Sequence, residues 1–221
     1  YLEGDRGHTF RILRGVKNRF GTTNDIGVFV MEERGLEEVV NPSALFVTRR
    51  SRDVQGAVVT ASMEGTRPLL VEIQALVIPS SYATPRRTSA GIDLNRAALI
   101  MAVLDKHAGV SFVGLDTFIN VVGGVRISET AVDLTVAASL VSSLEGRAVN
   151  SDTVIIGEIG LTGEILPVRS IDARLREAAK LGFSRYILPR SNLAGIKEQQ
   201  GPVNITGVEN IKEAIGACLS G

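Results

Sequence analysis

The sequence predicts an α/β (α+β) fold, in which helices flank a mixed β-sheet. First, β-branched apolar runs that end at glycine turns, 117–122 and 153–159, alternate with segments whose apolar residues recur at helical spacing. Second, two longer strand-like runs, 56–63 and 69–78, are joined by a short turn and predict an antiparallel pair. Third, 221 residues with 44% hydrophobics are enough to form a full buried core.

The remaining elements follow from periodicity and from turn residues. Thr130 to Asp133 have the form of a capping box at the start of a helix, and Ser170 has the form of a second helix cap. In chain order we expect strands 8–14 and 26–31 as a hairpin, strands 56–63 and 69–78, an exposed loop 79–88, a helix 92–107, a strand 117–122, a helix to Leu144, a strand 153–159, a helix after Ser170, a strand 185–188, a helix 191–199, a strand 203–205 and a helix 208–219.

Composition restricts the class of protein. The formal net charge is zero, so bulk electrostatics give no support for nucleic-acid binding. No apolar run is long enough to cross a bilayer and the first residues lack the form of a signal peptide, so we expect no membrane partner. The single cysteine, Cys218, excludes internal disulfides and thiolate zinc clusters in this chain. These features predict a cytoplasmic location, and the first residue, which is not methionine, suggests a piece of a longer protein.

The string GEIGLTGEILPVRSIDARLREAAKLGF, residues 157–183, resembles the proteolytic domain of Lon-type proteases. That family carries a serine at the start of a buried helix and a lysine on a later helix. The resemblance places the serine position at Ala131 and the lysine position at Asp172. A methyl group is no nucleophile, and an aspartate cannot replace the neutral amine that accepts the serine proton. We therefore expect a Lon-like mixed sheet with a degenerate dyad and no catalytic residue.

A rearranged peptidase site is the less favoured alternative. Its nucleophile would be Ser128, Ser139 or Ser170, and its base would be Asp133, Asp172 or His107. Asp172 also has a simpler interpretation as a carboxylate favoured by the helix dipole, and His107 as a residue that compensates the dipole at a helix end.

The strings LEGDRGHTFRILRG and KNRFG, in residues 2–21, resemble the end of the RecA-like ATPase core in the RadA (Sms) family of bacterial DNA repair proteins. In similar ring motors this loop reaches the γ-phosphate that is bound by the neighbouring subunit. The resemblance implies that Lys17 and Arg19 act in trans on nucleotide, while Asn18, Phe20 and Gly21 shape the loop. It also implies a homo-oligomer, with a hexameric ring as the expected form.

The same resemblance implies cofactors that this chain does not hold by itself. The full-length protein would bind ATP and Mg²⁺, and a zinc module would lie at its N-terminus. The present sequence has no Walker A motif, so we expect no enzyme activity from this chain alone. We expect residues 1–48 to end the ATPase core, 49–54 to form a linker, and 55–221 to form the Lon-like domain.

Four arginines are candidate contacts for single-stranded or branched DNA: Arg86, Arg87, Arg126 and Arg169. Arg86 and Arg87 are adjacent in the loop 79–88, which also carries Tyr82 and is the nearest approach in this sequence to a nucleic-acid contact element. A solvated surface loop is the competing interpretation. The family resemblance adds a RecA-type recombinase as a possible partner, and a protein-interaction module without DNA contact stays open as an alternative function.

Overall fold

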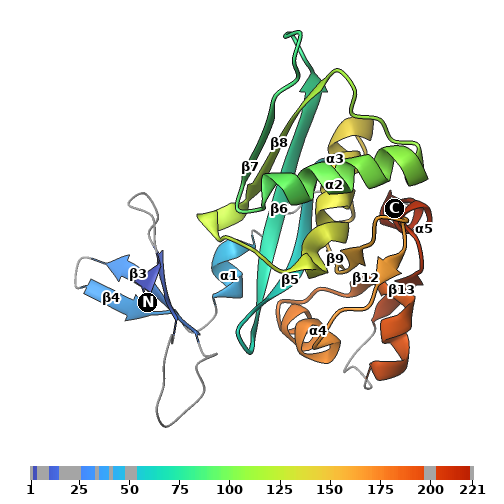
Figure 1. Cartoon of the computed structure of the whole chain (residues 1–221). Coiled ribbons are helices and arrows are strands. Elements are labelled where there is room, and N and C mark those ends of the chain that lie inside the picture. The colour runs from blue at the N-terminus through green and yellow to red at the C-terminus, as the bar shows by residue number, and fades with distance from the viewer. Residues whose placement is uncertain are drawn as a thin grey trace.

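The structure is a computed structural model, which describes residues 2–3, 10–14, 26–32, 35–39, 42–47, 54–196 and 203–219. Its central element is a seven-stranded mixed sheet with the order β13-β12-β9-β5-β6-β8-β7 (Figure 1). The predicted α/β fold with a mixed sheet and flanking helices is confirmed. The strands of this sheet are β5 (Ala57–Glu64), β6 (Arg67–Pro79), β7 (Arg87–Ala90), β8 (Leu115–Val121), β9 (Thr153–Ile155), β12 (Arg185–Pro189) and β13 (Asn204–Val208).

Strand directions divide this sheet into two parts. Strands β13, β12, β9 and β5 are parallel to one another, whereas β6 is antiparallel to both β5 and β8, and β7 is parallel to β8. The predicted antiparallel pair is thus β5 and β6, in a register that pairs Ala57 with Gln74 and Glu64 with Arg67. Near the N-terminus, β1 (Leu2–Glu3), β2 (Phe10–Arg14), β3 (Ile26–Glu32) and β4 (Gly35–Glu38) form a separate antiparallel sheet, so the predicted hairpin of 8–14 with 26–31 is present as β2 and β3.

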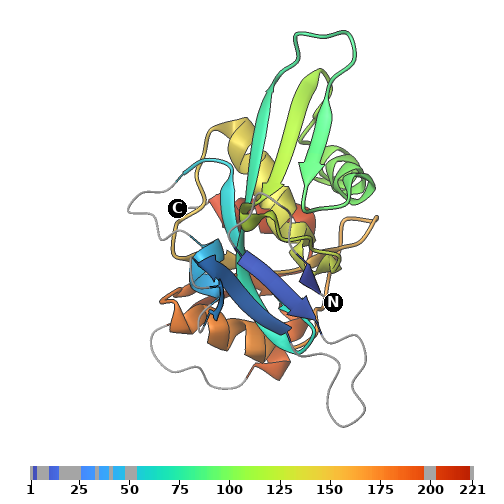
Figure 2. The same cartoon turned by 90° about the vertical axis from the view of Figure 1, so that its left-hand side faces the viewer.

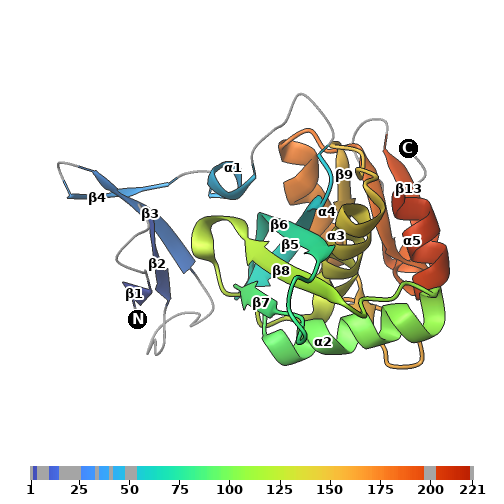
Figure 3. The same ribbon diagram turned by 90° about the horizontal axis from the view of Figure 1, so that it is seen from above.

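Alternation along β6 shows how the two faces of the sheet are covered. Leu69, Val71 and Ile73 belong to the larger apolar cluster, whereas Leu70 belongs to the smaller one, because successive side chains point to opposite faces. Helix α3 (Asp133–Glu145) packs on the first face, with α2 (Leu94–Val103) and α5 (Ile211–Leu219) beside it (Figure 3). Helix α4 (Ile171–Lys180) and the short α1 (Ser43–Phe46) pack against the second face.

The second face is covered only in part. The loop that joins β6 to β7 stands at the free end of the sheet, away from α4 (Figure 2). Near that end, Leu76 and Ile78 keep 53% and 40% of their surface exposed, although Ala75 and Val77 between and beside them are buried. Above this part of the sheet lies a cavity of about 290 Å³ that is lined by Val54, Gln74, Leu76, Phe118 and Asn120 among others.

Several local predictions require correction. Thr130–Val132 form a short 3-10 turn, and α3 begins at Asp133 without a side-chain cap, so the predicted capping box is wrong. Both polar side chains of that box instead bind distant residues: Thr130 donates to Glu158 and Asp133 accepts from Arg96. Ser170 does precede α4, but it adopts a left-handed conformation with φ of 58° and makes no side-chain cap.

Three element boundaries also differ from the predictions. The expected strand 153–159 is divided into β9 and β10 (Glu158–Ile159), and β10 pairs with β11 (Ile165–Leu166) as a separate ribbon. The described part of the expected helix 191–199 contains a 3-10 segment, Arg190–Gly195, and residues 197–199 lie outside the described residues. The expected helix 92–107 is present as α2 followed by a π-helical turn, Leu104–Ala108. The expected linker lies outside the described residues except for Val54, so the domain limits stay predictions.

Candidate functional site

The residue in the predicted serine position, Ala131, lies in the turn before α3 and is only 5% exposed. Its backbone is fixed by Gly157, whose amide donates to the Ala131 carbonyl at 2.7 Å. The Gly157 carbonyl in turn accepts from the Leu134 amide at 3.0 Å. Ala131 belongs to the smaller apolar cluster together with Val168 and Ile171, the residue that precedes Asp172. The fold therefore brings the two predicted dyad positions to one region, where the serine position is a methyl group in an apolar environment.

The residue in the predicted lysine position, Asp172, is the second residue of α4 and is partly buried. A carboxylate in the first turn interacts favourably with the partial positive charge of a helix N-terminus. A carboxylate can accept hydrogen bonds but carries no amine.

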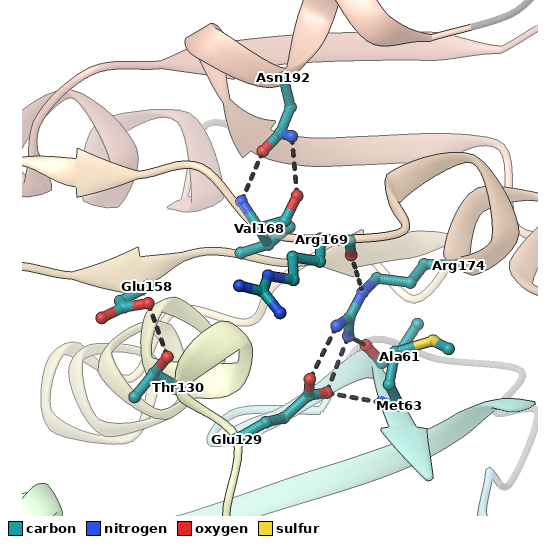
Figure 4. A network of polar contacts seen from close by, with 9 residues as sticks. All are labelled: Ala61, Met63, Glu129, Thr130, Glu158, Val168, Arg169, Arg174 and Asn192. Atoms are coloured by element: carbon teal, nitrogen blue, oxygen red, sulfur yellow. Dashed lines mark hydrogen bonds and ion pairs between the residues drawn. The ribbon is translucent and has the colours of Figure 1, made fainter. Parts of the chain in front are cut away.

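A buried ion pair fixes the same region. The Arg174 side chain is 2% exposed, and its guanidinium donates two hydrogen bonds to the carboxylate of Glu129, from Nη1 to Oε1 at 2.8 Å and from Nη2 to Oε2 at 2.7 Å (Figure 4). It also donates to the backbone carbonyls of Ala61 and Arg169. Glu129 accepts a further bond from the Met63 amide at 2.6 Å. One side chain therefore links β5, the segment before α3, and α4.

A second charged pair lies at the start of α3. Arg96 of α2 donates from Nε to Oδ1 of Asp133 at 3.0 Å and from Nη2 to Oδ2, and Asp133 also accepts from the Ile159 amide at 3.2 Å. The hydrogen bond with Asp133 raises the pKa of Arg96. Burial raises the pKa of the Asp133 carboxyl, although Arg96 and the Ile159 amide oppose that rise. This carboxylate is thus committed to Arg96 and to the backbone of β10.

Two further contacts complete the network in Figure 4. The Thr130 hydroxyl donates to Glu158 Oε2 at 2.6 Å, which fixes the turn before α3 against β10. The Asn192 amide group pairs with the backbone of Val168, accepting from its amide and donating to its carbonyl, each at 2.9 Å. The segment that leads into α4 is therefore held by Asn192 at Val168 and by Arg174 at the Arg169 carbonyl.

The candidates for a rearranged peptidase are placed as follows. Ser139 is fully buried inside α3, and its hydroxyl donates to the Val136 carbonyl at 2.9 Å. Ser128 and Ser170 are exposed. His107 lies in the π-helical turn after α2, with Nε2 3.2 Å from the Leu161 carbonyl oxygen. Ser139 and Asp133 each have a structural partner that accounts for their polar groups.

The four candidate DNA-binding arginines do not form one cluster. Arg86 ends the β6–β7 loop, and Arg87 is the first residue of β7. Arg126 lies near the opposite end of that strand, because the adjacent Ile127 amide donates to the carbonyl of Gly91, just after β7. The four residues of β7 span roughly 13 Å, and this length separates Arg86 and Arg87 from the end of the strand where Arg126 lies. Arg169 is exposed next to α4, and its side chain is directed to the space between Glu158 and Glu129 (Figure 4).

The predicted nucleotide-sensing residues Lys17, Asn18, Arg19, Phe20 and Gly21 lie outside the described residues. Within the described part of the chain, no group of three or more His, Cys, Asp or Glu side chains is arranged to hold a metal ion. The same residues contain no helix that is long and apolar enough to cross a bilayer.

Comparison with known proteins gives two findings. A family model described as subunit ChlI of Mg-chelatase matches residues 93–192, which include α2, α3 and α4. Over nearly its whole length, the chain is similar to curated proteins called DNA repair protein RadA. It is 52% identical to the one from Halalkalibacterium halodurans over 99% of the chain, 51% to that of Bacillus subtilis over 100%, and 47% to that of Streptococcus pneumoniae over 97%. The resemblance to RadA is confirmed. The chain spans about half the length of these relatives, 48%, 48% and 51% respectively.

Three site residues of this RadA-like chain, Arg174, Glu129 and Arg96, were not predicted from its sequence. Arg174 is one, although a signal was present: it lies at the spacing of Ile171, Leu175 and Ala178, the buried face of α4. An arginine on a buried face implies a carboxylate partner. Its partner Glu129 and the Arg96–Asp133 pair had no such signal, because they depend on contacts between residues 45 and 37 positions apart.

Proposed function

We propose that this RadA-like chain is part of a ring-forming, DNA-dependent ATPase of recombinational DNA repair. In this proposal residues 55–221 serve as a Lon-like scaffold for oligomerisation and DNA binding, without peptidase activity. The observation that carries the proposal is the 52% identity to a DNA repair protein RadA over 99% of the chain. Fold alone does not define function, so the state of the degenerate site is the second support.

The residues at the degenerate site support a structural role and not a catalytic one. A serine peptidase requires a hydroxyl next to a proton acceptor, with donors ready for an oxyanion. Here the serine position is the buried methyl group of Ala131, and the nearby Arg174 and Glu129 are engaged with each other and with backbone groups. A guanidinium remains protonated and cannot act as a base. Polar groups that could assist chemistry instead hold β5, α3 and α4 together.

The full-length protein would supply the remaining parts. It would bind ATP and Mg²⁺ in an ATPase core, of which residues 1–48 would be the end, and zinc in an N-terminal module. Lys17 and Arg19 would act on nucleotide bound by the neighbouring subunit, which requires a ring. We propose a cytoplasmic protein that acts on single-stranded or branched DNA and cooperates with a RecA-type recombinase.

Light scattering coupled to gel filtration tests the ring. We expect a particle of several chains, with six as the expected number, at concentrations of tens of micromolar. A strict monomer in that range, in a chain whose circular dichroism shows a folded state, would contradict the scaffold role.

Peptide turnover tests the loss of catalysis. We expect no cleavage of casein or of fluorogenic peptides above a buffer control. Cleavage that disappears in Ser128→Ala or Ser170→Ala, and not in Ser139→Ala, would instead establish the rearranged peptidase.

Fluorescence anisotropy with labelled single-stranded DNA separates DNA binding from a pure protein-interaction module. Phosphate contacts predict affinity that falls with salt, with a slope of about 0.7 per phosphate neutralised on a single strand. Replacing both Arg86 and Arg87 should therefore reduce the slope by roughly 1.4. Binding that is absent at low salt, in a chain that forms the ring, favours the interaction module.

A further inference from the structure

The β6–β7 loop, residues 80–86, carries an aromatic side chain stacked on a cation. The guanidinium carbon of Arg86 lies 3.9 Å from the centroid of the Tyr82 ring. The Tyr82 side chain is nonetheless 56% exposed, so Arg86 covers only part of the ring. The loop lies at the free end of the sheet, beyond the helices (Figure 1).

The backbone of this loop is fixed at both ends. The Arg86 amide donates to Asp116 Oδ1 at 2.7 Å, and its carbonyl accepts from the Thr117 amide at 2.8 Å, so β8 holds one end. At the other end the Ser80 amide donates to the Gly114 carbonyl at 2.9 Å, and the Ser80 hydroxyl accepts from the Tyr82 amide at 3.2 Å. Tyr82 and Arg86 are thereby preorganised, which lowers the ordering cost of binding a ligand.

The charges around the stack favour an anionic ligand. Among the described residues, neither Arg86 nor Arg87 forms an ion pair with a carboxylate. The carboxylate of β8, Asp116, is 5% exposed, accepts from the Arg86 amide and has a weaker charge interaction with the Arg86 side chain. Two cations and one aromatic ring are therefore presented to solvent at one loop.

We propose that Tyr82 and Arg86 form a stacking site for an unpaired base of a nucleic acid, with Arg86 and Arg87 contacting the adjacent phosphates. This inference rests on the proposed DNA-facing role and assigns it to a specific site. A base has a π-face that stacks on tyrosine whatever its sequence, and an adjacent arginine adds a cation–π contribution. In a duplex the bases are already stacked on one another, so the site selects single strands, bulges or frayed ends.

A fluorescent variant gives a direct readout, because the chain contains no tryptophan. Tyr82→Trp places one fluorophore at the proposed site. We expect its emission to be quenched when the folded chain binds an oligothymidylate of about 20 nucleotides, which exceeds common single-strand site sizes. A duplex of the same length should bind more weakly and leave the emission nearly unchanged.

Affinity measurements supply the matched comparison. Tyr82→Ala should weaken oligothymidylate binding about 5- to 150-fold, the value of one base–aromatic stack, without changing the salt slope. Tyr82→Phe should retain most of the affinity, because the ring remains. Leu161→Ala, which removes another exposed apolar side chain (65% exposed) on the distant β10–β11 turn, should leave binding unchanged.

Two outcomes would overturn the inference, and they differ in what else they contradict. If the chain binds DNA but Tyr82→Ala binds equally well and Tyr82→Trp emission does not respond, the stacking site is wrong while the DNA-facing role stands. If the chain forms its ring and binds no nucleic acid at low salt, both are wrong, and the loop is a protein contact.

Discussion

Replacing Arg174 with methionine should destabilise the domain, because it removes the buried cation of the Glu129–Arg174 pair. Methionine keeps much of the aliphatic volume but removes every donor. Glu129 then loses both guanidinium bonds, and the carbonyls of Ala61 and Arg169 lose their side-chain donor. Glu129 retains only the Met63 amide as a partner among these contacts.

The magnitude follows from burial. Removing one partner of a buried ion pair costs about 3–5 kcal/mol. The Glu129 side chain is 24% exposed and can regain some water, so the lower end of that range, about 3 kcal/mol, is expected. Urea denaturation measures this cost: with a slope of about 2 kcal/mol per M, the midpoint should fall by about 1.5 M.

Arg190→Met is the matched control. Arg190 is 49% exposed and pairs with Glu209 and Glu213 at the surface, where such pairs contribute about 1 kcal/mol or less. If Arg174→Met and Arg190→Met have the same midpoint, the Glu129–Arg174 pair does not hold the three segments together and the reasoning fails.

Three further predictions concern other parts of the fold. Gly91→Ala should lower the free energy of unfolding, measured by urea denaturation, by more than about 2 kcal/mol, because φ is +90° and a Cβ would lie 2.6 Å from Val121 and from the Val125 carbonyl oxygen. Gly109→Ala is the control, with φ of +72° and nothing within 4 Å of a Cβ, and it should cost only about 1 kcal/mol. Equal costs for the two variants would contradict the packing at Gly91. Burial raises the pKa of the Cys218 thiol to about 12, so iodoacetamide at pH 8 should label it only after unfolding in guanidinium, and rapid labelling of the folded chain would show an exposed thiolate. Hydrogen bonds from the Arg86 amide and from Ser80 lower the pKa of Asp116. The contribution of this carboxylate to stability is therefore complete above the usual carboxyl pKa of about 3.9 and is lost as the pH falls through the lowered pKa. The difference in unfolding free energy between the wild type and Asp116→Asn should shrink only in strong acid, and a decrease already at pH 6 would refute this.

The sequence predicted the elements whose signal is local. Strands β5 and β6 are strand-like runs joined by a short turn, and α2 carries apolar residues at helical spacing, so all three were found with boundaries within a few residues. The resemblance to RadA was likewise carried by contiguous strings and is confirmed. The assignment of Lys17 and Arg19 to the nucleotide of a neighbour stays a prediction.

The sequence failed where distant partners compete with local ones. Thr130 and Asp133 have the pattern of a capping box, but Glu158 and Arg96 offer them stronger, charge-assisted bonds. The run 153–159 has the composition of one strand, yet the Gly157 amide and carbonyl bond to Ala131 and Leu134 at the start of α3, and β9 ends at Ile155. Neither partner could be identified from spacing along the chain.

The same contacts support the proposal that this region has a structural role and no peptidase activity. A catalytic serine and lysine must remain mobile and accessible, with a neutral amine at hand, whereas Ala131 contributes only a buried methyl group to an apolar cluster. The neighbouring carboxylates Glu129 and Glu158 would favour the charged form of any amine introduced beside them, because opposite charges stabilise each other. Once the Glu129–Arg174 pair supports the packing of β5, α3 and α4, its loss affects folding before it affects any reaction.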